Sequence, residues 1–124
     1  MKKYLTLFLT VALASVFVLA GCGSANSKVT DGVSNMLQTT NQLAKAIEAN
    51  DQAKVKKVGP TLEDQWSSFE DDVKKENKTL YEKVERYLDP TIAGSQADSL
   101  DKSALGKLNS QLTDALKELK SKTK

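Results

Sequence analysis

The fold is decided by residues 62–88, which read LEDQWSSFEDDVKKENKTLYEKVERYL. Apolar residues recur every three or four positions here and just upstream, as they do along one face of an amphipathic helix. The apolar stripe consists of Val55, Val58, Leu62, Trp66, Phe69, Val73, Leu80, Val84 and Tyr87. The centre of the chain is therefore predicted to be helical, with this face buried.

Polar residues interrupt the stripe at one point. Glu76 and Asn77 stand where apolar residues are due, and Thr79 and Glu82 follow with the spacing of a capping box. The sequence thus predicts a break near Asn77 and a new helix that begins at Thr79. A single helix, kinked at Pro60 on its outward side, remains the alternative.

Similar patterns predict a helix on each side of this region. The first stripe consists of Val29, Val33, Met36, Leu37, Leu43, Ala44 and Ile47, with Thr40 where an apolar residue is due. Asn50 and Asp51 are expected to end that helix and cap the next. Pro90 is expected to end the third helix, because the residue before a proline disfavours the helical conformation, and residues 91–99 are expected to form a loop. Asp101 is the expected cap of a last helix, whose stripe is Leu105, Leu108, Leu112, Leu116 and Leu119.

No segment alternates polar and apolar residues as a half-buried strand does. The predicted fold class is all-α, an antiparallel bundle of about four helices over residues 28–124.

The N-terminus has the features of a bacterial lipoprotein signal peptide. Met1-Lys2-Lys3 is positively charged, Tyr4–Ala20 is apolar, and Leu19-Ala20-Gly21-Cys22 ends the run at the single cysteine of the chain. These features predict cleavage of residues 1–21, a diacylglyceryl group on Cys22 and a short tether over 22–27. The predicted location is the extracytoplasmic side of the cell membrane. An uncleaved transmembrane anchor is the alternative, but the run is at the short end of the about 20 residues that a span needs.

Composition excludes several classes of function. The chain has 18 basic and 16 acidic residues, and loss of Lys2 and Lys3 with the signal peptide would leave 16 of each, so no nucleic-acid partner is expected. The absence of histidine excludes His-containing metal sites and Ser-His-Asp or Cys-His catalysis. With Cys22 lipidated, no disulfide can form.

Because the sequence contains no recognisable pair of nucleophile and base, the protein is predicted not to be an enzyme.

A doubled pattern supplies the candidate site. Trp66-Ser-Ser-Phe-Glu70 is echoed by Tyr81-Glu-Lys-Val-Glu85, so that each glutamate lies one turn beyond an aromatic residue at the edge of the buried stripe. Glu63 precedes Glu70 by seven residues and lies on nearly the same face. Carboxylates on facing helices of a bundle can bind a hard cation, which makes these three glutamates candidate metal ligands. The alternative is that the glutamates face water or pair with lysines, and that the aromatic residues only fill the core.

The region from Asn50 to Leu88 resembles the helical extracytoplasmic segments of bacterial iron permeases and the imelysin-like lipoproteins that accompany them. The similarity rests on residues that include Trp66, Glu70, Tyr81 and Glu85. It implies a module for iron handling or permease association, with these four residues at the matching positions. Imelysin-like proteins carry a histidine-containing metal motif, whereas this chain has no histidine.

Two functions follow from these observations. The first is a non-enzymatic lipoprotein that binds iron or another hard cation, or a membrane permease, in iron uptake. The second is an envelope lipoprotein that binds another protein and has no metal site. A further possibility is that the Lys-rich end of the last helix contacts anionic lipid headgroups; its lysines are Lys117, Lys120, Lys122 and Lys124.

Overall fold

The computed structural model describes residues 24–123, all of whose regular structure is α-helical. The predicted signal peptide and Cys22 lie outside these residues. The helices are α2 (Ser24–Glu48), α3 (Gln52–Val58), α4 (Thr61–Ser67), α5 (Glu70–Glu76), α6 (Lys78–Ser95) and α7 (Lys102–Lys122). None of them has the length and the apolar character that a membrane crossing requires.

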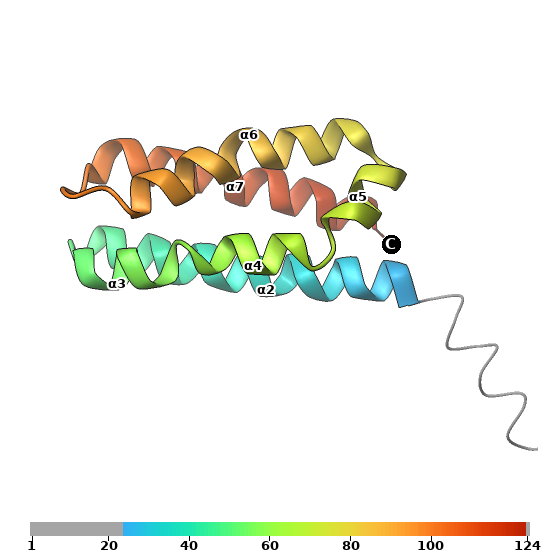
Figure 1. Cartoon of the computed structure of the whole chain (residues 1–124), viewed down its shortest axis with the longest axis horizontal. Helices are drawn as coiled ribbons and strands as arrows, with labels where there is room; N and C mark the ends of the chain where they lie inside the picture. Colours follow the sequence, from blue (N-terminus) through green and yellow to red (C-terminus); the bar gives the residue numbers. More distant parts are fainter. Residues whose placement is uncertain (1–23, 124) are drawn as a thin grey trace, which may run out of the picture.

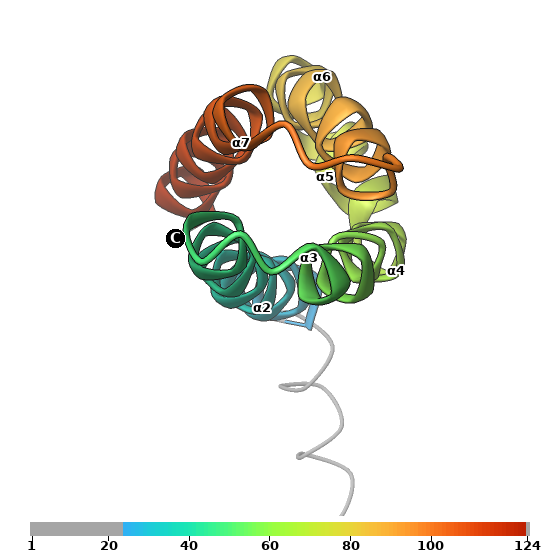
Figure 2. The ribbon, with the colours of Figure 1, turned by 90° about the vertical axis from the view of Figure 1, so that its left-hand side faces the viewer.

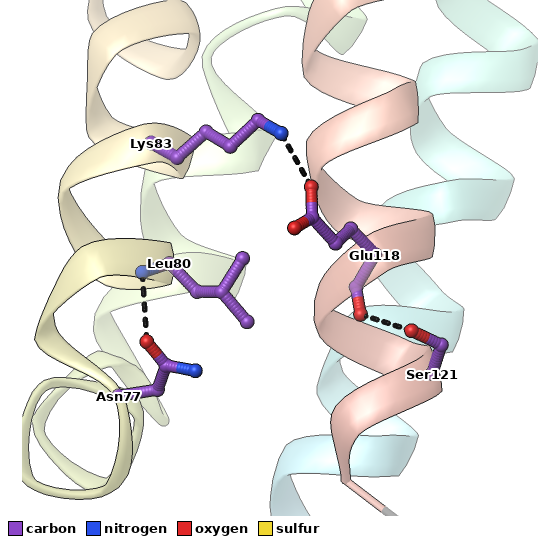
Figure 3. Close-up of polar contacts among 5 residues, drawn as sticks. All are labelled: Asn77, Leu80, Lys83, Glu118 and Ser121. Carbon is purple, nitrogen blue, oxygen red and sulfur yellow. Dashed lines mark hydrogen bonds and ion pairs between the residues drawn. The ribbon is translucent and has the colours of Figure 1, made fainter.

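The helices form an antiparallel bundle, which confirms the predicted all-α class (Figure 1). The described residues form six helices rather than about four, because the centre of the chain is divided into several short ones. Helix α2 runs along one edge, α3 and α4 return beside it end to end, and α6 and α7 form the second pair. Seen along the bundle axis, α2, α4, α6 and α7 surround a common core (Figure 2). Short α5 lies at the end where α2 begins and leads into α6. An ion pair between Lys83 and Glu118 links α6 to α7 (Figure 3).

The predicted breaks at Asn50 and near Asn77 are confirmed. Asn50 has a φ of 57°, in the left-handed region that commonly ends helices, and the Asp51 side chain accepts a hydrogen bond from the Lys54 amide at 3.1 Å. Asn77 separates α5 from α6. The centre is divided further, because α3 ends before Gly59 and α4 ends at Ser67. It therefore consists of several helices, and the kinked-helix alternative is wrong.

The predicted capping box is also wrong. Helix α6 begins at Lys78, and the Asn77 side chain accepts a hydrogen bond from the Leu80 amide at 3.1 Å (Figure 3). Thr79 is already inside the first turn. An asparagine two positions upstream satisfies the free amide, so the chain has no need of the Thr79–Glu82 pair.

A second correction concerns Pro90, which does not end its helix. Helix α6 continues through Pro90 to Ser95, so most of the loop expected over 91–99 is helical. Buried Thr91 and Ser95 lie on the core side of this extension, and Thr91 Oγ1 donates to the Tyr87 carbonyl at 2.6 Å. Burial of this face stabilises the helix against the local preference that proline imposes.

At the start of the bundle, α2 begins at Ser24, four residues earlier than expected. Ser24–Ser27 is therefore helical, whereas the sequence predicts it as part of the tether.

The core is apolar and contains members of all the predicted stripes. Its largest fully buried side chains include Trp66, Phe69, Met36, Leu43, Leu62, Leu88, Leu105, Leu112, Leu116 and Leu119. Thr40 is buried at the position where an apolar residue was due, and its hydroxyl donates to the Leu37 carbonyl at 3.0 Å.

Two glycines permit close packing in this core. A Cβ at Gly59 would overlap the side chain of Ser95, so the turn between α3 and α4 touches the end of α6. A Cβ at Gly32 would overlap the ring of Phe69, which lies directly against the α2 backbone. These contacts join segments that are far apart in the sequence.

Candidate functional site

The doubled pattern forms one cluster, in which the aromatic residue of each repeat hydrogen-bonds to the glutamate of the other repeat. Trp66 Nε1–H on α4 donates a hydrogen bond to Oε1 of Glu85 on α6. Tyr81 on α6 donates from its hydroxyl to Oε2 of Glu70, at the start of α5, at 3.4 Å. Each aromatic residue therefore pairs with the glutamate that follows the other one, rather than with its own neighbour along the helix.

Ring stacking supports this arrangement. The rings of Trp66 and Tyr81 are stacked, with centroids 5.8 Å apart and an interplanar angle of 25°. Phe69 meets Trp66 edge to face at 5.3 Å and 81°. Lys74 Nζ lies 5.3 Å from the centroid of the Tyr81 ring, as in a cation–π contact. The amphipathic stripe places Trp66 and Phe69 in the core, whereas Tyr81 stays half-buried at its edge.

The carboxylates of this cluster interact electrostatically. Burial raises the pKa of Glu85 above its usual value, because it disfavours the charged form, and the hydrogen bond from Trp66 offsets this in part. The nearby charges of Asp89, Glu70 and Glu63 raise that pKa further. Burial also raises the pKa of Tyr81, and Glu85 and Glu70 add to the effect. The cluster thus brings several acidic groups close together on the flank of the bundle, with the Lys74 ammonium beside its Tyr81 ring.

The three predicted metal ligands lie on three different helices. Glu70 and Glu85 belong to the cluster, and Glu63 is exposed on α4, near enough for its charge to affect Glu85. Among residues 24–123, however, no group of three or more carboxylate, cysteine or histidine side chains is placed to hold a metal ion. The structure therefore brings the glutamates close enough for their charges to interact, but it does not arrange them as the ligands of one metal ion.

The sequence prediction did not include two other polar features. Asn109 is buried in the leucine stripe of α7, where Nδ2 donates to the Thr40 carbonyl of α2 at 2.9 Å and Oδ1 has no partner among the described residues. A lone asparagine in a leucine stripe is a sequence signal that could have identified this link. Gln65 Oε1, next to Trp66 in the chain, is also buried without a partner.

Three hollows of the described surface have walls that contain no residue of the cluster. Two open grooves follow the α2–α7 seam and share Ala44, Gly106 and Asn109 in their walls. A more enclosed cavity of about 220 Å³ lies at the end of the bundle, with Val29, Val73, Leu80 and Leu119 among its walls.

These observations define the chain as an all-α bundle with an aromatic–carboxylate cluster. The chain is 27% identical over 92 residues to the iron uptake system component EfeM of Bacillus subtilis (strain 168). The match covers 74% of this chain and 24% of that relative, so the chain spans about a quarter of the relative's length. No family profile matches the chain. No solved structure matches it either.

The cluster lies within the matched part of the chain. A stretch of 92 residues in a chain of 124 includes positions 33–92 wherever it begins. Trp66, Glu70, Tyr81 and Glu85 all fall inside this range. The similarity to an iron uptake component therefore extends over the helices that build the cluster, and it supports the resemblance found in the sequence.

Proposed function

We propose that this chain is a non-enzymatic accessory module of bacterial iron uptake. Cys22 carries its lipid anchor, and the bundle lies on the extracytoplasmic side of the cell membrane. The observation that carries the proposal is the match of 92 residues to a component of an iron uptake system, because that stretch includes the cluster. A membrane permease is the partner that such a module would serve.

The cluster supports a direct role with iron. Ferric and ferrous ions are hard or borderline cations that bind carboxylate and phenolate oxygens, and Glu70, Tyr81 and Glu85 supply both kinds of atom. The acidic groups gathered at this position would attract a cation before any ligand is bound. To bind it, Glu85 would exchange its hydrogen bond with Trp66 for a metal contact. The module is therefore proposed to hold iron briefly, as cargo, rather than as a permanent cofactor.

A calorimetric titration of the full chain in detergent, with ferric citrate, ferrous and calcium salts in turn, tests this role. We expect saturable binding of iron and weaker binding of calcium. The double substitution Glu70→Gln with Glu85→Gln should lower the iron affinity at least about a hundredfold, because two carboxylate contacts are lost and each is worth more than about 1.4 kcal/mol. Glu82→Gln is the matched control, since Glu82 is exposed and pairs only with Lys78. Absent binding, or equal binding by all variants, would contradict the role.

A second function has one specific observation in its favour. Trp66 and Tyr81 already engage the two central glutamates through hydrogen bonds. An envelope module that only binds a protein partner would have this property. It predicts a melting temperature that iron does not change, and recovery of a specific membrane protein when the anchored chain is isolated from cells.

A further inference from the structure

The fold gathers lysines from four helices at one end of the bundle. The start of α2, the junction of α5 with α6 and the end of α7 meet there (Figure 1). The cavity of about 220 Å³ confirms their proximity, because its walls include Asn26, Asn77 and Thr123. This basic end, as we name it, carries Lys28, Lys74, Lys75, Lys78, Lys120 and Lys122.

Part of this positive charge is neutralised locally. Lys28 pairs with Asp72 at 3.8 Å, and Lys78 pairs with Glu82 at 3.9 Å. Lys74 lies over the Tyr81 ring. The basic end also includes Glu70, Asp71 and Glu76 of α5, so its six lysines face five carboxylates.

Three lysines at this end have neither an ion pair nor a contact with an aromatic ring within the described residues. Lys75, Lys120 and Lys122 are exposed and form no ion pair within residues 24–123. Lys75 lies in the last turn of α5, and Lys120 and Lys122 lie in the last turn of α7. Segments that are distant in sequence thus bring three exposed lysines to one end of the bundle.

The same face receives the preceding part of the chain. Residues 1–23 join the bundle at Ser24, where α2 begins, and their sequence includes the apolar run Tyr4–Ala20 and Cys22. A bilayer that holds the chain through this part would therefore lie next to the basic end. Tethering keeps the local concentration of headgroups high, so weak contacts suffice to hold the domain in one orientation.

We propose that the basic end docks on an anionic bilayer surface, with Lys75, Lys120 and Lys122 as its principal contacts. This inference rests on the membrane anchoring in the proposed function, but not on iron binding. Each lysine near an anionic leaflet contributes about fivefold to the docking equilibrium, so that three contribute roughly a hundredfold. The bundle would then stand on its basic end, with α3 and the loop between α6 and α7 directed away from the membrane.

Lysine acylation of the full chain in vesicles tests this orientation. One set of vesicles is phosphatidylcholine alone, and the other contains about 30% phosphatidylglycerol to supply negative charge. After flotation with the vesicles, acylation of Lys75, Lys120 and Lys122 should be at least about tenfold slower on the anionic membrane. The difference should disappear at about 0.5 M salt, which screens surface charge. Lys54, Lys56 and Lys57 of α3, near the opposite end, should react equally on both membranes.

Substitution separates lipid contact from other causes of protection. The triple variant Lys75→Gln, Lys120→Gln and Lys122→Gln should lose the slowing at Lys28, which is also at the basic end. The matched triple variant at Lys54, Lys56 and Lys57 should retain it. Circular dichroism verifies that both variants are folded.

Three results would overturn the proposal. They are equal acylation on the two membranes, protection at α3 in place of the basic end, and failure of the chain to float with anionic vesicles. Because the samples contain no iron, none of these results bears on the iron titration.

Discussion

The indole of Trp66 on α4 donates its N–H to the carboxylate of Glu85 on α6, so a fully buried aromatic residue holds a half-buried acid whose pKa is raised by burial. Tyr81 stacks on the same indole and donates to Glu70. This exchange of partners fixes α4, α5 and α6 relative to one another. The folded environment also gives Glu85 a higher pKa than it would have in the unfolded chain.

Stability should therefore depend on pH through Glu85. Its pKa is raised in the native state, which binds the proton more tightly than the unfolded chain does. The resulting stabilisation is complete below the usual value of about 4.5 and is lost as the pH rises through the raised pKa. We expect the free energy of unfolding of the native chain, minus that of Glu85→Gln, to fall as the pH rises from about 4 to about 7. Urea denaturation at a series of pH values measures it; a constant or rising difference would refute the assignment.

Removal of the α6 cap should weaken the bundle. Asn77→Ala deletes the acceptor of the Leu80 amide and should cost about 1 kcal/mol. Thr79→Ala is the control, because Thr79 is exposed inside the first turn and should change the stability by less than about 0.5 kcal/mol. Chemical denaturation measures both variants. A larger loss of stability in Thr79→Ala than in Asn77→Ala would show that Thr79 caps the helix, as the capping box predicts.

A pair of glycine substitutions tests the contact between the α3–α4 turn and α6. Gly59→Ala should cost about 1–3 kcal/mol, because the added methyl overlaps Ser95. Gly106→Ala, in the second turn of α7, should instead stabilise by about 0.5–1 kcal/mol, since the nearest atom to its Cβ is Ile47 Cγ2 at 3.9 Å. Thermal melts compare the two variants. Adding Ser95→Gly to Gly59→Ala should recover part of the lost stability, because it removes the side chain that the new methyl overlaps. If the stability does not recover, the strain does not arise at Ser95.

Pro90→Ala should stabilise the protein, because α6 is continuous at this position. Alanine restores the amide that can bond the Arg86 carbonyl, and the gain exceeds the entropy advantage of proline in the unfolded chain. The expected increase in the free energy of unfolding is about 1 kcal/mol. Urea denaturation measures it. A decrease of that size would mean that Pro90 ends a helix, as its sequence context suggests.

Local sequence rules predicted the helices and several of their ends. The break at Asn77 was predictable because polar residues stand in an apolar stripe, and Asp51 and Asp101 act as the expected caps. Pro90 shows where these rules fail. The helix beyond it is stabilised by burial of Thr91 and Ser95 against other helices, a tertiary contribution that no local window contains.

The candidate site was predictable in its members but not in its pairing. The doubled pattern singled out Trp66, Glu70, Tyr81 and Glu85, and the structure brings these four together. The exchange of glutamates depends on how α4 crosses α6, which spacing along one helix cannot reveal. Glu63 shows that a predicted helical face does not establish a contact. Its helical face was predicted, yet it contributes charge to the cluster without a direct contact.

Fluorescence of Trp66 during iron titration tests the central claim most directly. Trp66 is the single tryptophan of the chain and is 1% exposed, which protects it from collisional quenching by ions in solution. Iron bound at Glu85 would lie within one side chain of the indole and quench it. The account predicts saturable quenching by ferric citrate that Glu70→Gln with Glu85→Gln abolishes and Glu82→Gln preserves. Unchanged fluorescence at saturating iron, or equal quenching in the double variant, would contradict it.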